Sequence, residues 1–340
     1  MSIRFFPFSR NIPWEYNKGE VTPNISKEIW NKYIKNKKCN IICPGYLLEA
    51  FMCLLAYDVL VLSGLKMDRI IMPEQYNGMA KLFGYDNLKT SKQEGDLPSE
   101  FNRLLSFCRG YLTPIFFDKD DNVYFNFLLN YGTTAYSGYF GYKIPKIIRN
   151  FPFHKQLFNN LCTKYNIRIK QIDNFESKKI IKKYLINANF KEDDKYILLD
   201  NASIFYLTSD NRKSKFKYIF PQQVKMLVDE FSRLGYKTII MTNEYDKYKS
   251  MGMHGAIPAW INMPSEDVVS IMSGANGIIS YDQNIYLLGA LLGIKNVLSL
   301  EEEYEGWSFK DLDGLCYYDN CNWVYIKDND ISSIPKLLIG

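Results

Sequence analysis

The sequence has few of the residues on which metal and redox chemistry usually depend. It contains only two histidines, His154 and His254, and neither lies in a recognisable metal-binding or Ser-His-Asp motif. Its seven cysteines are scattered, with no Cys-x-x-Cys pair and no Cys/His cluster, which is typical of reduced thiols in a cytoplasmic protein. We therefore expect no metal site, no catalytic triad and a cytoplasmic location.

The sequence also lacks a membrane-spanning run, a strong charge imbalance and a dinucleotide-binding fingerprint. The apolar stretch 50–65 is interrupted by Asp58, and Pro7 and Pro13 argue against a signal peptide at the N-terminus. A net charge of +5 is below the range of dedicated nucleic-acid binders. No Gly-x-Gly-x-x-Gly follows a predicted strand, which disfavours a dehydrogenase. We expect at most a peripheral membrane contact.

Strands and helices are predicted to alternate from residue 38 onward. Residues 38–43 indicate a buried strand, 43–60 a helix with apolar residues every three or four positions, and 68–73 a second strand. Strand, glycine-containing turn, helix and strand together predict a βαβ unit of a parallel sheet. Residues 74–150 show little periodicity, and we expect loops and short strands there.

The length of 340 residues predicts two domains. We place an N-terminal, acceptor-side domain at 1–189 and a C-terminal, donor-binding domain at 190–340, joined by the polar stretch 189–195. The lysine-rich helix predicted at 176–188 is interpreted as a solvated helix face rather than a nucleic-acid patch.

The second half of the chain alternates more regularly than the first. We predict helices over 221–235, from a capping Ser265 onward, and over 285–292, and strands at 196–200, 237–242, 277–280 and 296–300. Gly235 and Gly293 are predicted to end two of the helices. This series predicts a doubly wound sheet that binds ligands at the carboxyl ends of its strands.

A short polar turn separates the strand ending at Ser280 from the next helix. Asp282, Gln283 and Asn284 therefore come at a helix N-terminus, where unpartnered backbone N–H groups and the helix dipole favour a phosphate group. The alternative is that Asp282 only caps a structural helix, and the residues alone favour the two interpretations about equally.

The stretch 264–300 resembles the donor-site region of the heptosyltransferase-like glycosyltransferases, family nine. Members show a helix, a strand, an Asp-Thr-Gly or Asp-Ser-Gly turn, a His, and then a small-residue helix. Asp282 matches the family's Asp, whereas Gln283 and Asn284 replace the next two residues and Leu287 stands at the usual His position. The resemblance implies a GT-B fold: two Rossmann-like, doubly wound α/β domains facing across a cleft. It also implies a nucleotide-diphosphate sugar as donor, without a metal or another cofactor.

The resemblance extends to the predicted N-terminal helix. Residues 46–57, YLLEAFMCLLAY, are similar to the family's Leu-Gly-Asp run and the apolar helix that follows it. Glu49 falls where the family places the Asp that acts as general base on the acceptor hydroxyl, and Gly45 is expected at the donor site. The alternative is that Glu49 is an ordinary first-turn glutamate favoured by the helix dipole.

The family also uses a strand that ends in small hydroxyl residues close to the donor. Residues 198–203, LLDNAS, resemble that strand end and offer Asn201 and Ser203 as donor-binding residues. The pair Thr208-Ser209 is an alternative match to the hydroxyl motif.

A lysine after this strand neutralises the leaving diphosphate in the family. If Thr208-Ser209 is the hydroxyl motif, the lysine is Lys213; counting back from the following helix gives Lys217. Lys215 lies between them and is expected to contact the donor. A cation at this place stabilises the negative charge of the leaving group and makes a divalent metal dispensable. The alternative is that these lysines form a solvated surface.

These features together predict a glycosyltransferase that moves a sugar from a nucleotide-diphosphate sugar to a hydroxyl acceptor, a saccharide or glycan. One alternative is a glycosyltransferase that modifies hydroxymethylated DNA. Another is a non-catalytic nucleotide-sugar-binding or assembly protein, which the altered turn at 283–284 and the missing His favour.

Overall fold

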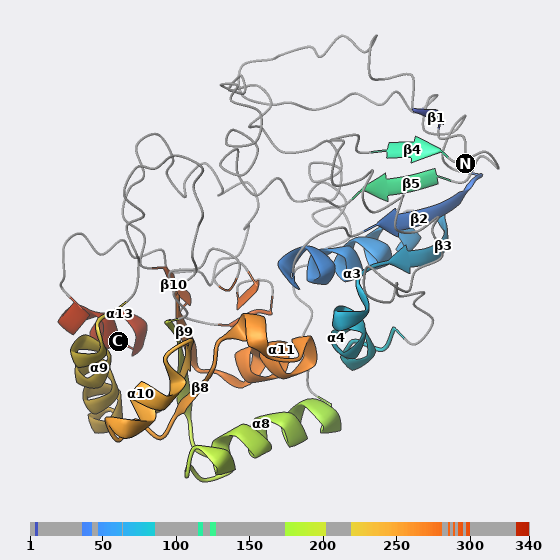
Figure 1. Cartoon of the computed structure of the whole chain (residues 1–340). Coiled ribbons are helices and arrows are strands. Elements are labelled where there is room, and N and C mark those ends of the chain that lie inside the picture. The colour runs from blue at the N-terminus through green and yellow to red at the C-terminus, as the bar shows by residue number, and fades with distance from the viewer. Residues whose placement is uncertain are drawn as a thin grey trace, which may run out of the picture. The chain divides into compact units, whose positions relative to one another are not determined.

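The computed structural model describes residues 4–5, 36–42, 47–62, 64–85, 115–117, 123–126, 174–201, 219–280, 285, 288–289, 292–294, 297–299 and 331–339. The chain divides into two compact units (Figure 1). The N-terminal unit comprises Met1–Ala80, Tyr85–Arg168 and Thr208–Arg212, and the C-terminal unit comprises Lys81–Gly84, Ile169–Leu207 and Lys213–Gly340.

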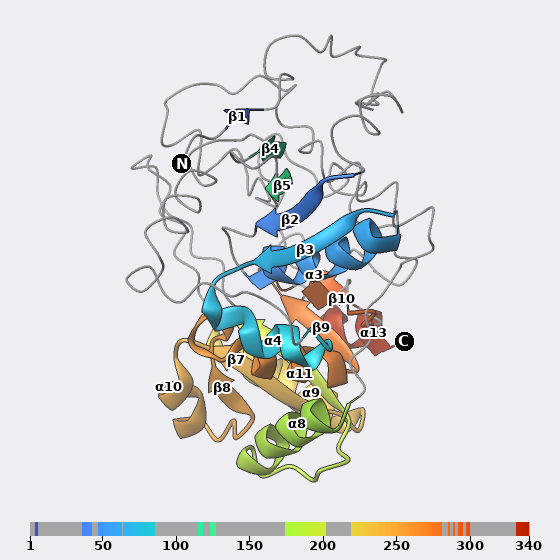
Figure 2. The same cartoon turned by 90° about the vertical axis from the view of Figure 1, so that its right-hand side faces the viewer.

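The N-terminal unit contains the strand-helix-strand that the sequence predicted. Strand β2 (Lys38–Ile42) pairs in parallel with β3 (Lys66–Ile71), and helix α3 (Leu47–Leu62) connects them. Helix α3 packs along both strands, as Figure 2 shows, and buries Phe51 and Leu54 completely. The βαβ prediction is therefore confirmed. It could be made because the sequence shows the apolar face of a helix between two apolar strands.

The rest of the N-terminal sheet combines antiparallel and parallel pairs. Strands β4 (Ile115–Phe117) and β5 (Val123–Asn126) pair antiparallel, and so do β1 (Arg4–Phe5) and β4. The connection 118–122 is too short for a parallel crossover, which needs about a dozen residues or more. Strand β5 also pairs in parallel with β2, so the order β1-β4-β5-β2-β3 makes a mixed sheet in which β4 alone runs in the opposite direction.

Two short helices follow β3 in a region where loops and short strands were expected. They are the 3-10 helix η1 (Glu74–Tyr76) and helix α4 (Asn77–Leu82), which bury Tyr76, Met79 and Ala80. Neither is long enough to show a clear helical repeat in the sequence.

The C-terminal unit is built on a fully parallel sheet. Its strands are β6 (Tyr196–Asn201), β7 (Lys237–Thr242), β8 (Ala256–Pro258), β9 (Gly277–Ser280) and β10 (Val297–Ser299). Their order is β10-β9-β6-β7-β8, so the chain builds outward from β6 on one side and then returns to build β9 and β10 on the other. The predicted doubly wound α/β sheet is confirmed for this unit.

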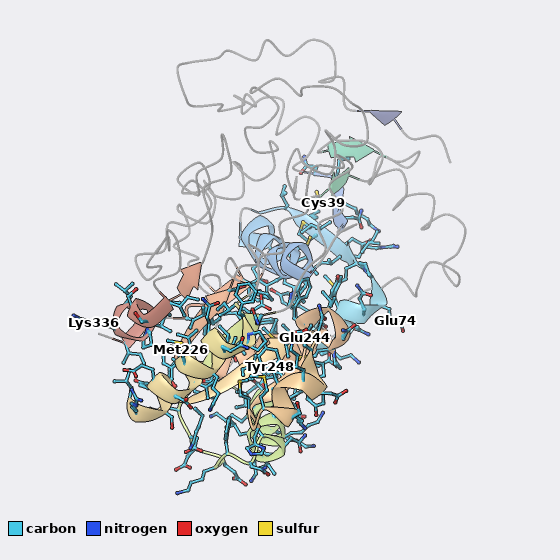
Figure 3. All side chains as sticks on the ribbon, turned by 60° about the vertical axis from the view of Figure 1, so that its left-hand side comes forward. Cys39, Glu74, Met226, Glu244, Tyr248 and Lys336 are labelled. Carbon is cyan, nitrogen blue, oxygen red and sulfur yellow. The ribbon has the colours of Figure 1, made fainter. Side chains whose placement is uncertain are left out.

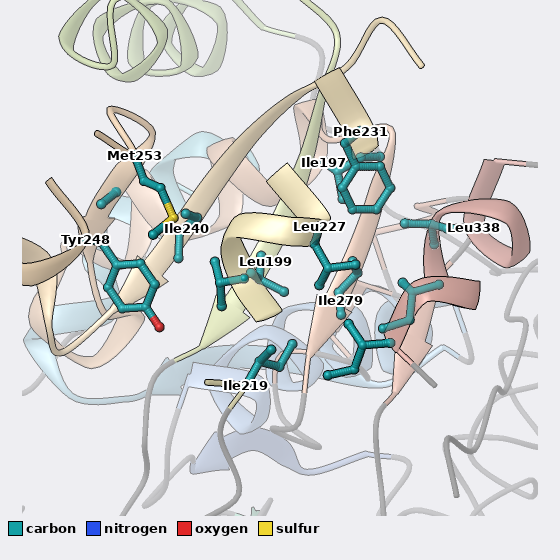
Figure 4. Close-up of a cluster of buried hydrophobic side chains, with 14 residues drawn as sticks. Ile197, Leu199, Ile219, Leu227, Phe231, Ile240, Tyr248, Met253, Ile279 and Leu338 are labelled. Atoms are coloured by element: carbon teal, nitrogen blue, oxygen red, sulfur yellow. The ribbon is translucent and has the colours of Figure 1, made fainter. Parts of the chain in front are cut away.

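Helices cover the two faces of this sheet, and one face carries a large apolar core. Helices α9 (Pro221–Arg233), α10 (Tyr245–Ser250) and α13 (Ile334–Ile339) contribute to it together with inward side chains of β6, β7 and β9. Figure 4 shows this cluster, which includes Leu199 and Phe231. Complete burial of a side chain of that size contributes about 1.5–3 kcal/mol. The core thereby fixes α9 and α10 against the strands.

The opposite face carries α8 (Phe175–Asn187) and α11 (Ser265–Gly274). The Tyr184 hydroxyl on α8 donates to Asp267 Oδ2 on α11 at 2.7 Å. Gly274 allows close contact, because a Cβ there would lie 2.7 Å from Ile181 Cδ1. Helix α8, which the sequence placed in the N-terminal domain, is therefore packed inside the C-terminal unit.

The boundary between the units consequently differs from the expected one. It falls between Arg168 and Ile169, rather than at 189. The polar stretch 189–195, expected as a linker, is the turn between α8 and β6, and its Glu192 forms an ion pair of 2.6 Å with Lys182 on α8. A polar composition marks a solvated turn as well as a linker, so composition alone could not separate the two.

The helix ends of the C-terminal unit largely follow the prediction. Gly235 and Gly293 have φ values of 83° and 73°, the left-handed conformation that ends a helix. Residues 285, 288 and 289 are helical, as expected. Ser265, however, is the first residue of α11 and Pro264 is the N-cap, so the predicted capping role of Ser265 is wrong.

Candidate functional site

The order of the C-terminal strands reverses between β6 and β9. In open α/β sheets, ligands bind at the carboxyl ends of the strands at such a point, because the flanking helices diverge there. Strand β6 ends in Asp200 and Asn201, and β9 ends in Ser280. All three side chains are buried, which is uncommon for polar residues and makes this the candidate functional site.

Asp200 and Ser280 tie the two strand ends together. They are direct neighbours in the parallel register, and the Ser280 hydroxyl donates to Asp200 Oδ2 at 2.6 Å. The exposed fractions of the two residues are 2% and 0%. A short, buried hydrogen bond to a carboxylate is among the stronger kinds. It fixes Ser280, the residue that precedes segment 281–284.

Asn201 makes a second set of contacts beside the first. Its Oδ1 accepts from the Ile219 backbone N–H at 2.8 Å, and its Nδ2 donates to the Ile219 carbonyl at 3.0 Å. The same Nδ2 donates to the Tyr248 hydroxyl at 2.6 Å. The chain therefore leaves β6 at Asn201 and comes back to the same place at Ile219, just before α9.

Asp200 and Asn201 point to opposite faces of the sheet, since side chains alternate along a strand. Asn201 follows Leu199 on the face with the apolar cluster, and Tyr248 belongs to that cluster. The end of β6 is thus held on one face by β9 and on the other by α10 and the residue before α9. Both sets of contacts lie at the reversal point.

The structure describes only part of the predicted site. Glu49 lies in the first turn of α3, as expected, and its side chain is outside the described residues. Asn201 lies at the reversal point, with its amide group hydrogen-bonded to Ile219 and Tyr248. The other predicted residues lie outside the described part of the chain: Gly45, Ser203, Thr208, Ser209, Lys213, Lys215, Lys217, Asp282, Gln283 and Asn284. Their roles stay predictions.

Three residues of the site were not found from the sequence. Asp200 had a signal, because it is the one charged residue of the otherwise apolar strand 196–200. Ser280 had a weaker one, as the polar end of the strand GIIS. Tyr248 had none, because it lies on the short helix α10, which carries no periodic apolar pattern.

The described residues give no indication of a metal site or a membrane span. Among them, no group of three or more His, Cys, Asp and Glu side chains is placed to hold a metal ion. No helix within the same described ranges is long and apolar enough to cross a bilayer.

No protein-family model and no curated protein sequence matches the chain. Among solved structures it is similar to the ADP-heptose LPS heptosyltransferase II of E. coli, with a TM-score of 0.49 and 10% identity, covering 89% of this chain and 98% of that chain. It is similar to a glycosyl transferase family 9 protein from Veillonella parvula, with a TM-score of 0.49 and 12% identity, covering 88% and 90%. A UDP-N-acetylglucosamine 2-epimerase, named as putative, from Listeria monocytogenes has a TM-score of 0.43 and 12% identity, covering 89% and 88%.

The first two structures bear the family name that the sequence resemblance led us to expect. Identities of 10–12% and TM-scores below 0.5 carry no argument about activity. The function therefore has to be argued from the residues and geometry of this chain.

Proposed function

We propose that the chain is a GT-B glycosyltransferase that moves a sugar from a nucleotide-diphosphate sugar to a hydroxyl acceptor. The observation that carries the proposal is the reversal of strand order between β6 and β9, with buried polar residues at both strand ends. A doubly wound sheet offers its ligand site at that point. The diphosphate of the donor is proposed to bind there.

The segments that begin at this point carry the residues proposed to bind the diphosphate. One starts after Asn201 and contains Lys213, Lys215 and Lys217; the other starts after Ser280 and contains Asp282. Ser203, Thr208, Ser209, Gln283 and Asn284 provide further polar groups in the same two segments. Because Asp200 and Ser280 are neighbours, both segments start from adjacent strand ends.

In the proposed reaction, the acceptor oxygen attacks the anomeric carbon of the donor sugar. The bond between this carbon and the diphosphate oxygen breaks, and the nucleoside diphosphate leaves with the electron pair. Lys213 or Lys217 stabilises the negative charge on the diphosphate, which makes a metal unnecessary. Glu49 takes the proton from the acceptor hydroxyl. Gly45, two positions before the start of α3, is proposed to line the donor site.

The proposal is tested by a thermal-shift panel of nucleoside diphosphates and their sugars, which needs no acceptor. A ligand that binds only the folded state adds about 2.7 kcal/mol of stability at a concentration of about 100 Kd. We expect one nucleotide to raise the melting temperature and its sugar conjugate to be hydrolysed slowly. A panel in which no member raises the melting temperature at millimolar concentration would contradict the proposal.

The same panel distinguishes the second candidate function from glycosyl transfer. Gln283, Asn284 and Leu287 depart from the family pattern, which favours a non-catalytic nucleotide-sugar-binding protein. That candidate predicts stabilisation by a nucleotide without any hydrolysis of its sugar conjugate. For the acceptor we propose a saccharide or glycan; salt-sensitive binding to hydroxymethylated DNA would favour the DNA alternative instead.

A further inference from the structure

Asn201 joins three parts of the C-terminal unit that are distant in the sequence. It is the last residue of β6, and its partners are Ile219, which precedes α9, and Tyr248 on α10. Asn201, Ile219 and Tyr248 are all buried, with exposed fractions of 4%, 0% and 0%. We call these three residues the clasp.

Every hydrogen-bonding group of the Asn201 amide has a partner inside the clasp. The oxygen accepts from the Ile219 N–H, and the amino group donates to the Ile219 carbonyl and to the Tyr248 hydroxyl. An asparagine side chain offers one carbonyl oxygen and two N–H groups, so this set uses both of its donors. The Asn201 amide therefore has no further N–H donor to offer a ligand, and any effect on a ligand is exerted through the residues that it positions.

The clasp closes both ends of the segment 202–218. Residue 201 precedes this segment and residue 219 follows it, and the two are joined by two hydrogen bonds. Bringing the ends of a segment together costs conformational entropy, and in the folded protein this cost is incurred before any ligand binds. Tyr248 holds the clasp to the core, since its ring lies in the apolar cluster (Figure 4).

We infer that Asn201 and Tyr248 are positioning residues for the donor, an inference that rests on the proposed function. Segment 202–218 contains the lysines proposed to bind the diphosphate. The clasp keeps both ends of this segment at the carboxyl end of β6 before the donor binds. The apparent affinity of a site is its intrinsic affinity multiplied by the fraction of molecules that are binding-competent. Loss of the clasp therefore raises the KM for the donor and leaves kcat at saturating donor nearly unchanged.

Two tyrosine variants separate positioning from stability. Tyr248→Phe removes the hydroxyl that contacts Asn201. Tyr196→Phe removes a hydroxyl that donates to the buried Ile271 carbonyl at 2.6 Å, at the amino end of the same strand. Both changes delete one oxygen from a buried tyrosine of the C-terminal unit. They affect opposite ends of β6: Tyr196 is its first residue, and Tyr248 on α10 contacts its last residue.

The readouts are nucleoside diphosphate affinity, KM and kcat for the donor, and hydrogen exchange at the Ile219 amide. For Tyr248→Phe we expect affinity to fall roughly three- to tenfold, the ratio that the net contribution of a buried hydrogen bond corresponds to. The KM should rise by the same factor, kcat should stay within about twofold, and Ile219 should exchange faster. Tyr196→Phe should lower the melting temperature and leave affinity and Ile219 exchange unchanged.

The outcomes distinguish the clasp from the proposed function. If wild-type protein binds no nucleoside diphosphate, the proposed function fails, and the clasp's role in donor binding fails with it. If wild type and Tyr248→Phe bind the donor equally, or if both tyrosine variants lower affinity alike, the clasp alone is overturned. Should Tyr248→Phe not fold, Asn201→Asp replaces it: this variant keeps an acceptor for Ile219, loses both N–H donors, and is expected to raise KM in the same direction.

Discussion

The two units differ in where their sheets carry buried polar residues. In the C-terminal unit, Asp200, Asn201 and Ser280 sit at the carboxyl ends of neighbouring parallel strands and hydrogen-bond across elements. In the N-terminal unit, Asn40 is a buried polar residue in the middle of β2, between β3 and β5. The strand order of the N-terminal sheet also reverses, between β2 and β5, but its buried Asn40 lies in mid-strand, whereas the three residues of the C-terminal sheet lie at strand ends. This difference is the reason that we propose donor binding in the C-terminal unit.

The largest effect is expected in the N-terminal unit, at the proposed base. Glu49→Gln should lower kcat by about 10²- to 10⁴-fold, the usual contribution of a general base, and leave nucleoside diphosphate affinity within about twofold. The matched control is Glu74→Gln, which changes an exposed acid of η1 in the same unit (Figure 3). Full turnover by Glu49→Gln would remove this residue from the mechanism and leave the N-terminal unit without a catalytic group.

The next largest effect is expected where two parallel strands of the C-terminal unit lie close to each other. A Cβ at Gly255, just before β8, would collide with the backbone carbonyl oxygen of Thr238 on β7. Gly255→Ala should therefore destabilise the protein by about 2–3 kcal/mol in urea unfolding, in the range of overpacked sites. Gly64→Ala in the N-terminal unit has open space but φ of 85°, and should cost about 1 kcal/mol. Equal losses of unfolding free energy in the two variants would contradict this difference in packing between the two glycines.

A smaller change in stability is expected at the strand ends, together with a change in binding. Ser280→Ala removes a hydrogen bond to the buried Asp200 carboxylate, which should cost about 1.5–3 kcal/mol. It should also weaken nucleoside diphosphate binding. Asn40→Ala is the control in the other sheet, because it alters a buried polar residue in the middle of β2, away from the carboxyl end of its strand. Comparable weakening of nucleotide binding by Asn40→Ala would break the comparison between the units.

The smallest effect is a loss of stability at alkaline pH. Burial, followed by the hydrogen bond to Asp267, raises the pKa of Tyr184, and burial alone raises the pKa of Tyr196. A raised folded-state pKa keeps the native tyrosine protonated where the unfolded one ionises. Its contribution is complete below about pH 10 and falls by about 1.4 kcal/mol per pH unit above it.

Urea unfolding between pH 8 and 11 measures this loss for each tyrosine. Tyr196→Phe should flatten the alkaline decline relative to wild type. An unchanged slope would show that Tyr196 does not titrate during unfolding. In the N-terminal unit, burial raises the pKa of Cys39 to about 12. The unfolded thiol ionises near its ordinary pKa, which is lower than that of tyrosine, so the loss of stability that Cys39 causes should begin at a lower pH.

The sequence predicted the elements whose own residues specify them. The apolar runs of β6, β7 and β9 read as buried parallel strands, and Gly235 and Gly293 marked helix ends correctly. Strand β8 and helix α10 were missed because they are short and carry no repeat. Strands β4 and β5 were not assigned individually, because residues 74–150 show little periodicity, so the direction of β4 could not be inferred either.

The site was predictable to a lesser degree than the fold. Asn201 was recognised as a residue at the end of β6, but its partners Ile219 and Tyr248 are 18 and 47 residues away in the chain. Such contacts arise when helices pack on the sheet, and no local pattern encodes them. The pairing of Asp200 with Ser280 depends in the same way on β9 lying next to β6.

The central claim is that a nucleoside diphosphate binds at the carboxyl ends of β6 and β9. Hydrogen exchange of the full chain, with and without the nucleotide that stabilises it most, tests this claim most directly. We expect protection in peptides that contain Asn201, Ile219 and Ser280, and none in those that contain β2 and β3. Protection of β2 and β3 alone, with exchange at the ends of β6 and β9 unchanged, would contradict it.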